Sequence, residues 1–352
     1  MANINESISL ETFKLSQNTL LSKSLMASDC ENTDVPQTPL ALNPASTEPH
    51  IAILLCTKDG ERFLDEQLES IRNQYHKNIH LYASDDGSID NTLHILNMHQ
   101  ERWSKERFSI KIGPQQGYAA NFLSLACSPK IEADYYAFSD QDDIWDQDKI
   151  TRAISKLDTV SPGTPALYCS RTQLIEANGV HLGRTPLYRR PPSFANSLVQ
   201  SIGSGNAMVF NRAAREILYQ AGQLQIASHD WWAYSLISGA GGVVIYDPLP
   251  GVRYRQHDRN VLGASPGLKA TLLRIRLILK GRFQNWNTIN INALRQSEKL
   301  LAPENRETLD IYTAARTRSI LPRALGIWRS GVYRQTYMSN LGLFVATLLN
   351  KV

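Results

Sequence analysis

Short apolar runs alternate with amphipathic stretches along residues 51 to 138. Ile51 to Cys56, IAILLC, is uniformly apolar and predicts a strand that is buried on both faces. Residues 62 to 74 then carry apolar side chains at helical spacing. The same alternation predicts further strands at 80–84, 109–112 and 135–138 and further helices at 90–103 and 118–127. Strands that alternate with helices indicate an α/β fold with a mostly parallel central sheet flanked by helices.

The pattern loosens after residue 158, and the second half of the chain predicts fewer clear elements. We expect one helix over 144–157, in the run IWDQDKITRAISKL, because acidic side chains at its start complement the helix dipole. The remaining elements expected before residue 265 are strands at 167–175, 243–246 and 251–257 and helices at 213–221 and 231–237. From residue 268 onward, apolar and basic residues mix in a way that is typical of amphipathic helices.

Composition divides the chain into three regions. Residues 1–48 are rich in Ser, Thr, Asn and Pro, and we expect them to be disordered apart from a short helix within 10–26. Residues 49–264 form the predicted α/β domain. Residues 265–352 form a helical C-terminal extension with fourteen Lys and Arg against four acids, a net charge of +10 in a chain of net +4.

This basic extension predicts an anionic partner, for which we expect a membrane surface rather than a nucleic acid. The alternative is a helical bundle packed on the catalytic domain, with its charges solvated. No run of eighteen apolar residues predicts a membrane span, and the N-terminus lacks the basic head and apolar core of a secretory signal. We therefore expect a cytoplasmic protein, peripheral on the inner face of the cell membrane.

Polar clusters follow three of the predicted strands, where the strands of a parallel sheet hold their ligands. They are Thr57-Lys58-Asp59, Asp85-Asp86 and Asp140-Gln141-Asp142-Asp143. Carboxylates that converge on one crevice repel each other unless a divalent cation neutralises them, and Mg²⁺ or Mn²⁺ would complete its shell with substrate phosphates. An EF-hand is excluded, because neither Asp140 nor Asp142 starts a loop with the required Gly and Glu. The sequence also contains no P-loop and no GxGxxG motif.

The sequence resembles the nucleotide-sugar-binding domain of family 2 glycosyltransferases, which have the GT-A fold. The resemblance covers residues 49–264 and rests on three ordered runs, IAILLCTKDGERFLDEQLESIRNQ, LYASDDGSIDNT and YYAFSDQDDIWDQDK. SHDWW, followed by YRQHDRNVLGAS, is similar to the rhamnosyltransferase-like branch of that family. The first 48 residues have no counterpart in it.

The resemblance implies roles for the residues at the strand ends. Thr57, Asp59 and Asp86 would contact the base and ribose of a nucleoside diphosphate sugar, and Asp140 would lie toward the ribose. A carboxylate suits uracil or thymine because it accepts a hydrogen bond from the imide N–H. Asp142 would bind the Mg²⁺ or Mn²⁺ ion that bridges the diphosphate and stabilises it as a leaving group.

Two further residues are implied outside these clusters. Asp230 would be the general base that deprotonates the acceptor hydroxyl in an inverting displacement; it is also a natural N-cap for the helix that follows. His257 would be a second metal ligand, with a hydrogen-bonded structural histidine as the alternative.

For several other polar and aromatic residues, the sequence leaves a functional and a structural interpretation open. Asp143 either assists at the metal or organises the loop. Trp231 and Trp232 either stack on a sugar or pack in the core, and the glycines of 203–206 either admit a sugar or serve steric needs. His229 is expected to be structural or to contact the acceptor.

The function expected from the sequence is a metal-dependent, inverting glycosyltransferase. It would move L-rhamnose from dTDP-rhamnose onto a growing, lipid-linked surface polysaccharide. A UDP- or GDP-sugar donor is the alternative within the same class. A nucleotidyltransferase would need a Gly-rich loop with a basic residue after the first strand, which CTKDGERF does not provide. A non-catalytic nucleotide-sugar-binding module is the third class.

Overall fold

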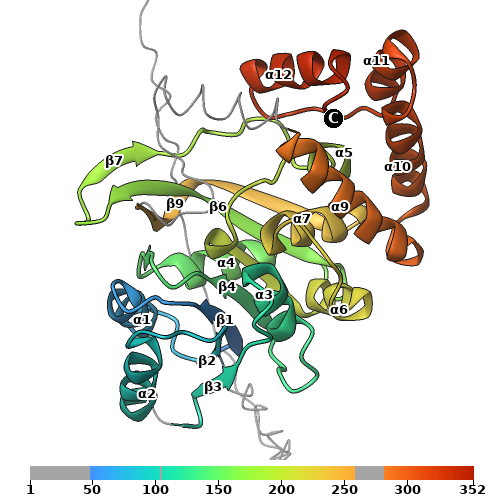
Figure 1. Ribbon diagram of the computed structural model, residues 1–352. Coiled ribbons are helices and arrows are strands. Elements are labelled where there is room, and N and C mark those ends of the chain that lie inside the picture. Colours follow the sequence, from blue (N-terminus) through green and yellow to red (C-terminus); the bar gives the residue numbers. More distant parts are fainter. Residues whose placement is uncertain (1–47, 104, 258–280) are drawn as a thin grey trace, which may run out of the picture. The chain divides into compact units, whose positions relative to one another are not determined.

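The computed structural model of the chain describes residues 48–103, 105–257 and 281–352 (Figure 1). The predicted disorder of residues 1–48 therefore lies outside the described residues, except for Glu48. Most of the predicted helical run from 268 to 283 lies outside them too. The compact unit described below spans the described residues from Glu48 onward.

Four parallel strands form the half of the sheet that the N-terminal part of the chain builds. In spatial order they are β3 (Phe108–Ile112), β2 (Ile79–Asp85), β1 (Ile51–Thr57) and β4 (Tyr135–Ser139). All seven residues of β1 are buried, as expected for a central strand covered on both faces. The helices that connect these strands are α1 (Leu64–Arg72), α2 (Thr92–Trp103) and α3 (Tyr118–Ala126). Every predicted element of this half is confirmed to within about two residues at each end, the usual uncertainty of element boundaries.

The other half of the sheet is mixed and continues from β4 in the order β8, β6, β9 and β5. Its strands are β5 (Ile144–Trp145), β6 (Ala166–Glu176), β7 (His181–Arg184), β8 (Met208–Asn211) and β9 (Val243–Gln256). β8 runs antiparallel to both β4 and β6, whereas β6 and β9 are parallel. The two strands predicted at 243–246 and 251–257 are thus one strand, which stays paired with β6 through register shifts between Ser170 and Thr172.

The helix predicted over 144–157 is wrong in its first five residues. Ile144 and Trp145 form β5 by pairing with Val252 and Arg253 of β9, and the helix α4 spans only Lys149–Leu157. The side chain of Trp145 is buried, and its backbone N–H donates to Ser70 Oγ at 3.0 Å. Burial against the sheet outweighed the local helical preference of this short run.

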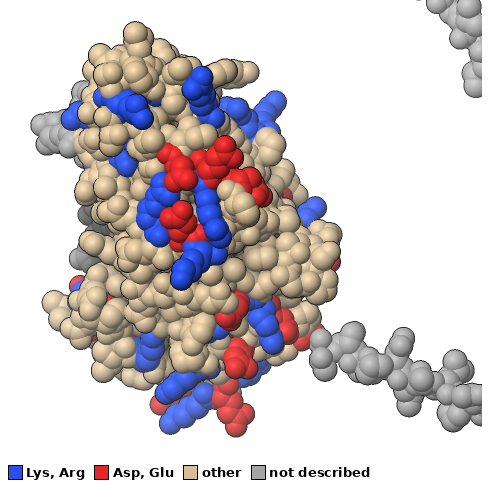
Figure 2. All heavy atoms as spheres, turned by 90° about the vertical axis from the view of Figure 1, so that its right-hand side faces the viewer, with Lys and Arg blue, Asp and Glu red and all other residues tan. Residues whose placement is uncertain are grey.

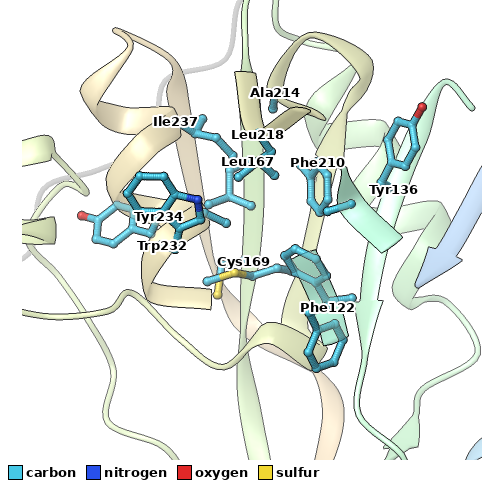
Figure 3. Packing of buried hydrophobic residues seen from close by; sticks show 14 of the residues in the cluster. Phe122, Tyr136, Leu167, Cys169, Phe210, Ala214, Leu218, Trp232, Tyr234 and Ile237 are labelled. Atoms are coloured by element: carbon cyan, nitrogen blue, oxygen red, sulfur yellow. The ribbon is translucent and has the colours of Figure 1, made fainter. Parts of the chain in front are cut away.

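Helices cover the mixed half of the sheet, and their buried side chains form the core with it. They are α5 (Phe194–Ser197), α6 (Arg212–Ala221), α7 (His229–Gly239) and the short helix η1 (Gly205–Ala207). Ten of the eleven residues of α7 are buried, so this helix lies within the core rather than on its surface. Figure 3 shows Trp232 and Ile237 of α7 packed beside Leu167 of β6.

The described part of the C-terminal extension is helical, as predicted. It contains α9 (Arg282–Gln296), η2 (Glu298–Leu300), α10 (Pro303–Arg316), α11 (Ile320–Arg329) and α12 (Tyr337–Leu348). Its backbone is tied to the α/β part, since Ala302 N–H donates to Gly239 O at 2.9 Å and Gln335 N–H donates to Gln200 Oε1 at 2.9 Å. Among the described residues, no helix combines the length and the hydropathy needed to cross a membrane.

Candidate active site

A cavity of about 790 Å³ opens where β1, β2 and β4 end, beside α3 and the start of α7. It is the edge at which a parallel sheet of this kind binds its ligands. Seven residues were expected to bind the donor or the metal or to act as the base, and all of them line this cavity: Thr57, Asp59, Asp86, Asp140, Asp142, Asp230 and His257. Residues separated by up to two hundred positions in the sequence are therefore brought to one place.

The end of β1 is fixed to the loop that follows β2. Thr57 Oγ1 donates to Asp85 Oδ1 at 2.8 Å. Asp59 adopts a left-handed backbone conformation with φ of 47°, which Asp tolerates better than most residues. Its N–H donates to Ser88 Oγ at 2.9 Å and its Oδ1 accepts from Ile89 N–H at 2.9 Å. These contacts hold both strand ends in one rigid wall of the cavity.

The two neighbouring carboxylates Asp85 and Asp86 have different tasks. Asp85 is buried and accepts from the N–H groups of Gly87 and Ser88, so it organises the turn and does not line the cavity. Asp86 lines the cavity, and it accepts from Gln115 N–H at 2.6 Å and Gly117 N–H at 2.9 Å. Asp86 therefore also positions the loop after β3, a task that the sequence did not indicate.

The carboxylates of the acidic loop after β4 have two different roles: Asp140 lines the cavity, and Asp143 holds the loop in place. Asp143 is buried, with Oδ1 accepting from Arg255 N–H at 2.9 Å and Oδ2 accepting from the Asn206 side chain. It does not line the cavity, which favours its loop-organising interpretation. Asp140 does line the cavity, where burial and then the charges of Asp142 and Asp230 raise its pKa to about 8. Carboxylates that raise each other's pKa in this way favour a bound cation.

Asp142 and His257 meet directly, with His257 Nε2 2.8 Å from Asp142 Oδ2. The pair offers one carboxylate oxygen and one imidazole nitrogen, both ligands that Mn²⁺ accepts. Among the described residues, no group of three His, Cys, Asp or Glu side chains is arranged to hold a metal ion alone. The residues fit a cation that takes the rest of its ligands from a diphosphate and water, as Mg²⁺ commonly does.

Asp230 is the second residue of α7, and Ser228 rather than Asp230 is the residue before the first turn. The N-cap interpretation of Asp230 is therefore wrong, although its Oδ1 does accept from Trp231 N–H at 2.6 Å and from Ser228 Oγ at 2.5 Å. Burial raises the pKa of the Asp230 carboxyl, and these hydrogen bonds partly offset the rise. A carboxylate with a raised pKa in a cavity is a suitable general base.

His229 is buried beside Asp230 and stacks on Phe122, with ring centroids 3.7 Å apart. Burial lowers its pKa to about 3, so the ring is neutral near neutral pH. Its two nitrogens have no hydrogen-bond partner among the described residues. A Cβ added at Gly205 would lie 2.0 Å from His229 Nε2, so this glycine serves a steric need where η1 approaches the ring.

Trp231 and Trp232 belong to the core. Their side chains are 6% and 0% exposed, and neither lines the cavity. Trp231 Nε1–H donates to Ser197 O at 2.5 Å, and Trp232 packs against the sheet (Figure 3). The sugar-stacking interpretation is therefore wrong for both residues, because α7 turns them away from the cavity that Asp230 faces.

The part of the cavity lining that comes from the start of α3 was not predicted from the sequence. Gly117, Tyr118 and Asn121 line the cavity, and Tyr118 Oη donates to Ala227 O at 3.1 Å, which joins α3 to the loop before α7. Burial first, and then the charges of Asp230 and Asp140, raise the pKa of Tyr118 to about 12. The sequence position of Gly117 could have indicated this part of the lining, because Gly117 follows the end of another parallel strand, β3.

Known proteins match this chain in sequence and in fold. Residues 52–218 match the family described as Glycosyl transferase family 2. The dTDP-rhamnosyl transferase RfbG of Shigella flexneri is 31% identical over 255 residues, which cover 68% of this chain and 84% of that protein. An uncharacterized glycosyltransferase of Haemophilus influenzae is 29% identical over 107 residues, 30% of this chain and 42% of that protein. The structure of GalNAc-T7 with UDP, GalNAc and Mn²⁺ matches with a TM-score of 0.50 at 9% identity, over 86% of this chain and 58% of the other.

Proposed function

The chain belongs to glycosyl transferase family 2, and we propose that within this family it is a metal-dependent, inverting rhamnosyltransferase. The observation that carries the proposal is the meeting of Asp140, Asp142 and Asp230 in one cavity at the strand ends. The first two carboxylates lie on the loop after β4, whereas Asp230 comes from α7. Donor-binding and acceptor-activating groups can thus face one reacting centre from different elements.

In the proposed mechanism Asp230 is the general base. Direct displacement with inversion needs one carboxylate that takes the proton from the acceptor hydroxyl as that oxygen attacks the anomeric carbon. Hydrogen bonds from Ser228 Oγ and from the N–H of Trp231 both reach Oδ1 of Asp230 and fix the side chain. The carboxylate lines the cavity, where the acceptor hydroxyl would approach it.

The nucleotide part of the donor would lie along the ends of β1 and β2. We propose that Thr57, Asp59 and Asp86 form the base and ribose site and that Asp140 lies toward the ribose. Backbone groups already hold Asp59 and Asp86 in place, so little side-chain freedom would be lost on binding.

Mg²⁺ or Mn²⁺ is the proposed cofactor, held by Asp142 and His257. Such a cation supplies positive charge that stabilises the diphosphate as it leaves. The placement of Asp140, Asp142 and Asp230 in one cavity supports the proposal, because a cation would offset the repulsion between their carboxylates. The solved GalNAc-T7 structure, which carries Mn²⁺ with UDP, is consistent with such a site on this fold.

For the donor we propose dTDP-L-rhamnose, supported by the name of the Shigella flexneri relative. For the acceptor we propose a lipid-linked saccharide of a growing surface polysaccharide such as an O-antigen. That acceptor would place the enzyme on the cytoplasmic face of the membrane, in contact with anionic lipid through the basic C-terminal region.

A donor panel tests this proposal. The full chain is incubated with Mn²⁺ or Mg²⁺ and with dTDP-rhamnose, UDP-sugars or GDP-sugars in turn, and donor binding and slow hydrolysis are measured. Tightest binding and fastest turnover of dTDP-rhamnose are expected. Preference for a UDP- or GDP-sugar would contradict the donor assignment but keep the reaction class, and failure to bind any of them would contradict both.

A further inference from the structure

The helices α11 and α12 carry a large exposed apolar surface at the C-terminal end of the chain. Each helix buries one narrow stripe, with Ile327 buried on α11 and Leu343 and Ala346 buried on α12. The buried guanidinium of Arg323 joins the two helices, since its Nη1 donates to Thr347 O at 3.0 Å. This hydrogen bond ties the first turn of α11 to the last turn of α12, and the remaining sides of both helices are exposed.

On the open face, large apolar side chains recur at helical spacing. On α11 they occupy positions i, i+4 and i+7, namely Leu321 (82% exposed), Leu325 (47%) and Trp328 (76%). On α12 four of them occupy positions i, i+4, i+7 and i+11, and three more lie on the helix or directly after it. The seven residues are each between 37% and 96% exposed, namely Tyr337, Leu341, Phe344 and Leu348, then Met338, Val345 and the C-cap residue Leu349. These ten residues are called the apolar face below. Large apolar side chains exposed in this number on two neighbouring helices are typical of an interaction site.

Charge identifies the partner of the apolar face. Residues 311–352 contain six Lys and Arg and no Asp or Glu. Arg318 and Arg329 are exposed at the two ends of α11, and exposed Arg190 lies over the Tyr333 ring at 3.9 Å, beside the start of α12. On the face shown in Figure 2, the acidic side chains gather in the middle and lower parts, and the upper end, where α11 and α12 lie, carries basic ones.

We propose that the apolar face is the surface by which this protein docks in the headgroup region of an anionic membrane. Apolar side chains would enter the acyl boundary while the arginines at the rim pair with lipid phosphates. A second copy of the chain fits less well, because a two-fold contact would bring two basic, acid-free surfaces together. The inference rests on the proposed function only in that a lipid-linked acceptor requires a membrane nearby.

Vesicle binding by the full chain tests this surface. Sedimentation is measured with vesicles of phosphatidylcholine alone and of equimolar phosphatidylcholine and phosphatidylglycerol. Leu321→Ser combined with Phe344→Ser is expected to weaken binding to the anionic vesicles by about tenfold or more. Arg318→Gln and Arg329→Gln are each expected to weaken it by about fivefold. The matched controls are Leu249→Ser, an exposed leucine of β9, and Lys130→Gln, an exposed lysine between α3 and β4, and both should bind as the unchanged protein does.

Trp328 reports the orientation directly. Its emission should shift to shorter wavelength with anionic vesicles, and Trp328→Phe should lose that shift while still binding. The inference would be overturned if the apolar-face variants bound anionic vesicles as the unchanged protein does. It would also be overturned if sedimentation velocity showed that the apolar face forms a dimer contact instead. Binding of dTDP-rhamnose is measured in the same variants. Retained donor binding in these variants would show that they are folded. If the unchanged protein binds the donor but not the anionic vesicles, the docking surface is wrong while the proposed function stands.

Discussion

The side chain of Gln141 pairs with the backbone of Lys58 through two hydrogen bonds. Its Oε1 accepts from Lys58 N–H at 2.8 Å, and its Nε2 donates to Lys58 O at 2.9 Å. Gly60 makes the approach possible, since a Cβ there would lie 2.3 Å from Gln141 Oε1. The residue between Asp140 and Asp142 thus joins the acidic loop to the end of β1, and it would fix the distance between the proposed nucleotide and cation sites.

Replacing Gln141 with Ala should loosen this connection without removing a carboxylate. Each hydrogen bond contributes about 1 kcal/mol, so the loss of both should weaken donor binding by up to about thirtyfold. Calorimetric titration with the donor measures the dissociation constant of each variant. Gln147→Ala, an exposed glutamine between β5 and α4, is the control. Unchanged donor affinity in Gln141→Ala would show that the loop holds its position without this pair.

Asp230→Asn should abolish transfer and preserve donor binding. The amide keeps the shape of the side chain but cannot take a proton, and loss of a general base typically costs about 10² to 10⁴ in kcat. Transfer rates and donor affinity are measured together, with Glu101→Gln on the exposed face of α2 as the control. Loss of donor binding along with transfer would mean that Asp230 has a structural role.

The pH profile of kcat/KM should have its acid limb above the ordinary carboxylate value of 3.8. The base must be ionised, and burial raises the pKa of Asp230, so activity is lost at higher pH than for a solvated Asp as the pH falls. His229 should add no second limb near neutral pH, because its pKa is about 3. Asp230→Glu should shift the pH midpoint of this acid limb. If the midpoint does not change, the acid limb belongs to another group.

Metal removal should stop transfer, and Mn²⁺ should restore it. His257→Ala, which removes the hydrogen-bonded partner of Asp142, should weaken Mn²⁺ affinity by roughly 10- to 100-fold. Mn²⁺ binding in the presence of the nucleoside diphosphate is followed by electron paramagnetic resonance, which does not depend on turnover. His181→Ala, an exposed histidine on β7, is the control. Equal Mn²⁺ affinity in the two variants would exclude His257 from the site.

Two tryptophans should differ sharply in their contribution to stability. Trp232 is fully buried, so Trp232→Ala should lower the free energy of unfolding by about 3 to 5 kcal/mol. Trp328 is 76% exposed, and Trp328→Ala should change it by no more than about 0.5 kcal/mol. Urea unfolding followed by circular dichroism measures both. A small effect at position 232 would contradict its place in the core.

The parallel half of the sheet could be predicted from the sequence because its signals are local. A strand buried on both faces is apolar throughout, as in IAILLC, and an amphipathic helix repeats about every 3.6 residues. Both signals act within a few residues, so β1 to β4 and their helices were predicted closely. The convergence of Thr57, Asp86 and Asp142 followed from the rule that parallel strands end at one edge of the sheet.

Only the tertiary structure could decide which polar residues hold the site together. Gln141 and Lys58 are 83 residues apart and His257 and Asp142 are 115 apart, and no periodicity links such positions. For the same reason Ile144 and Trp145 became a strand, and Trp231 and Trp232 became core. Residue type and spacing determine which groups can do the chemistry, because they are local properties. Burial and long-range pairing determine which of those groups face the cavity, because they depend on how distant segments pack.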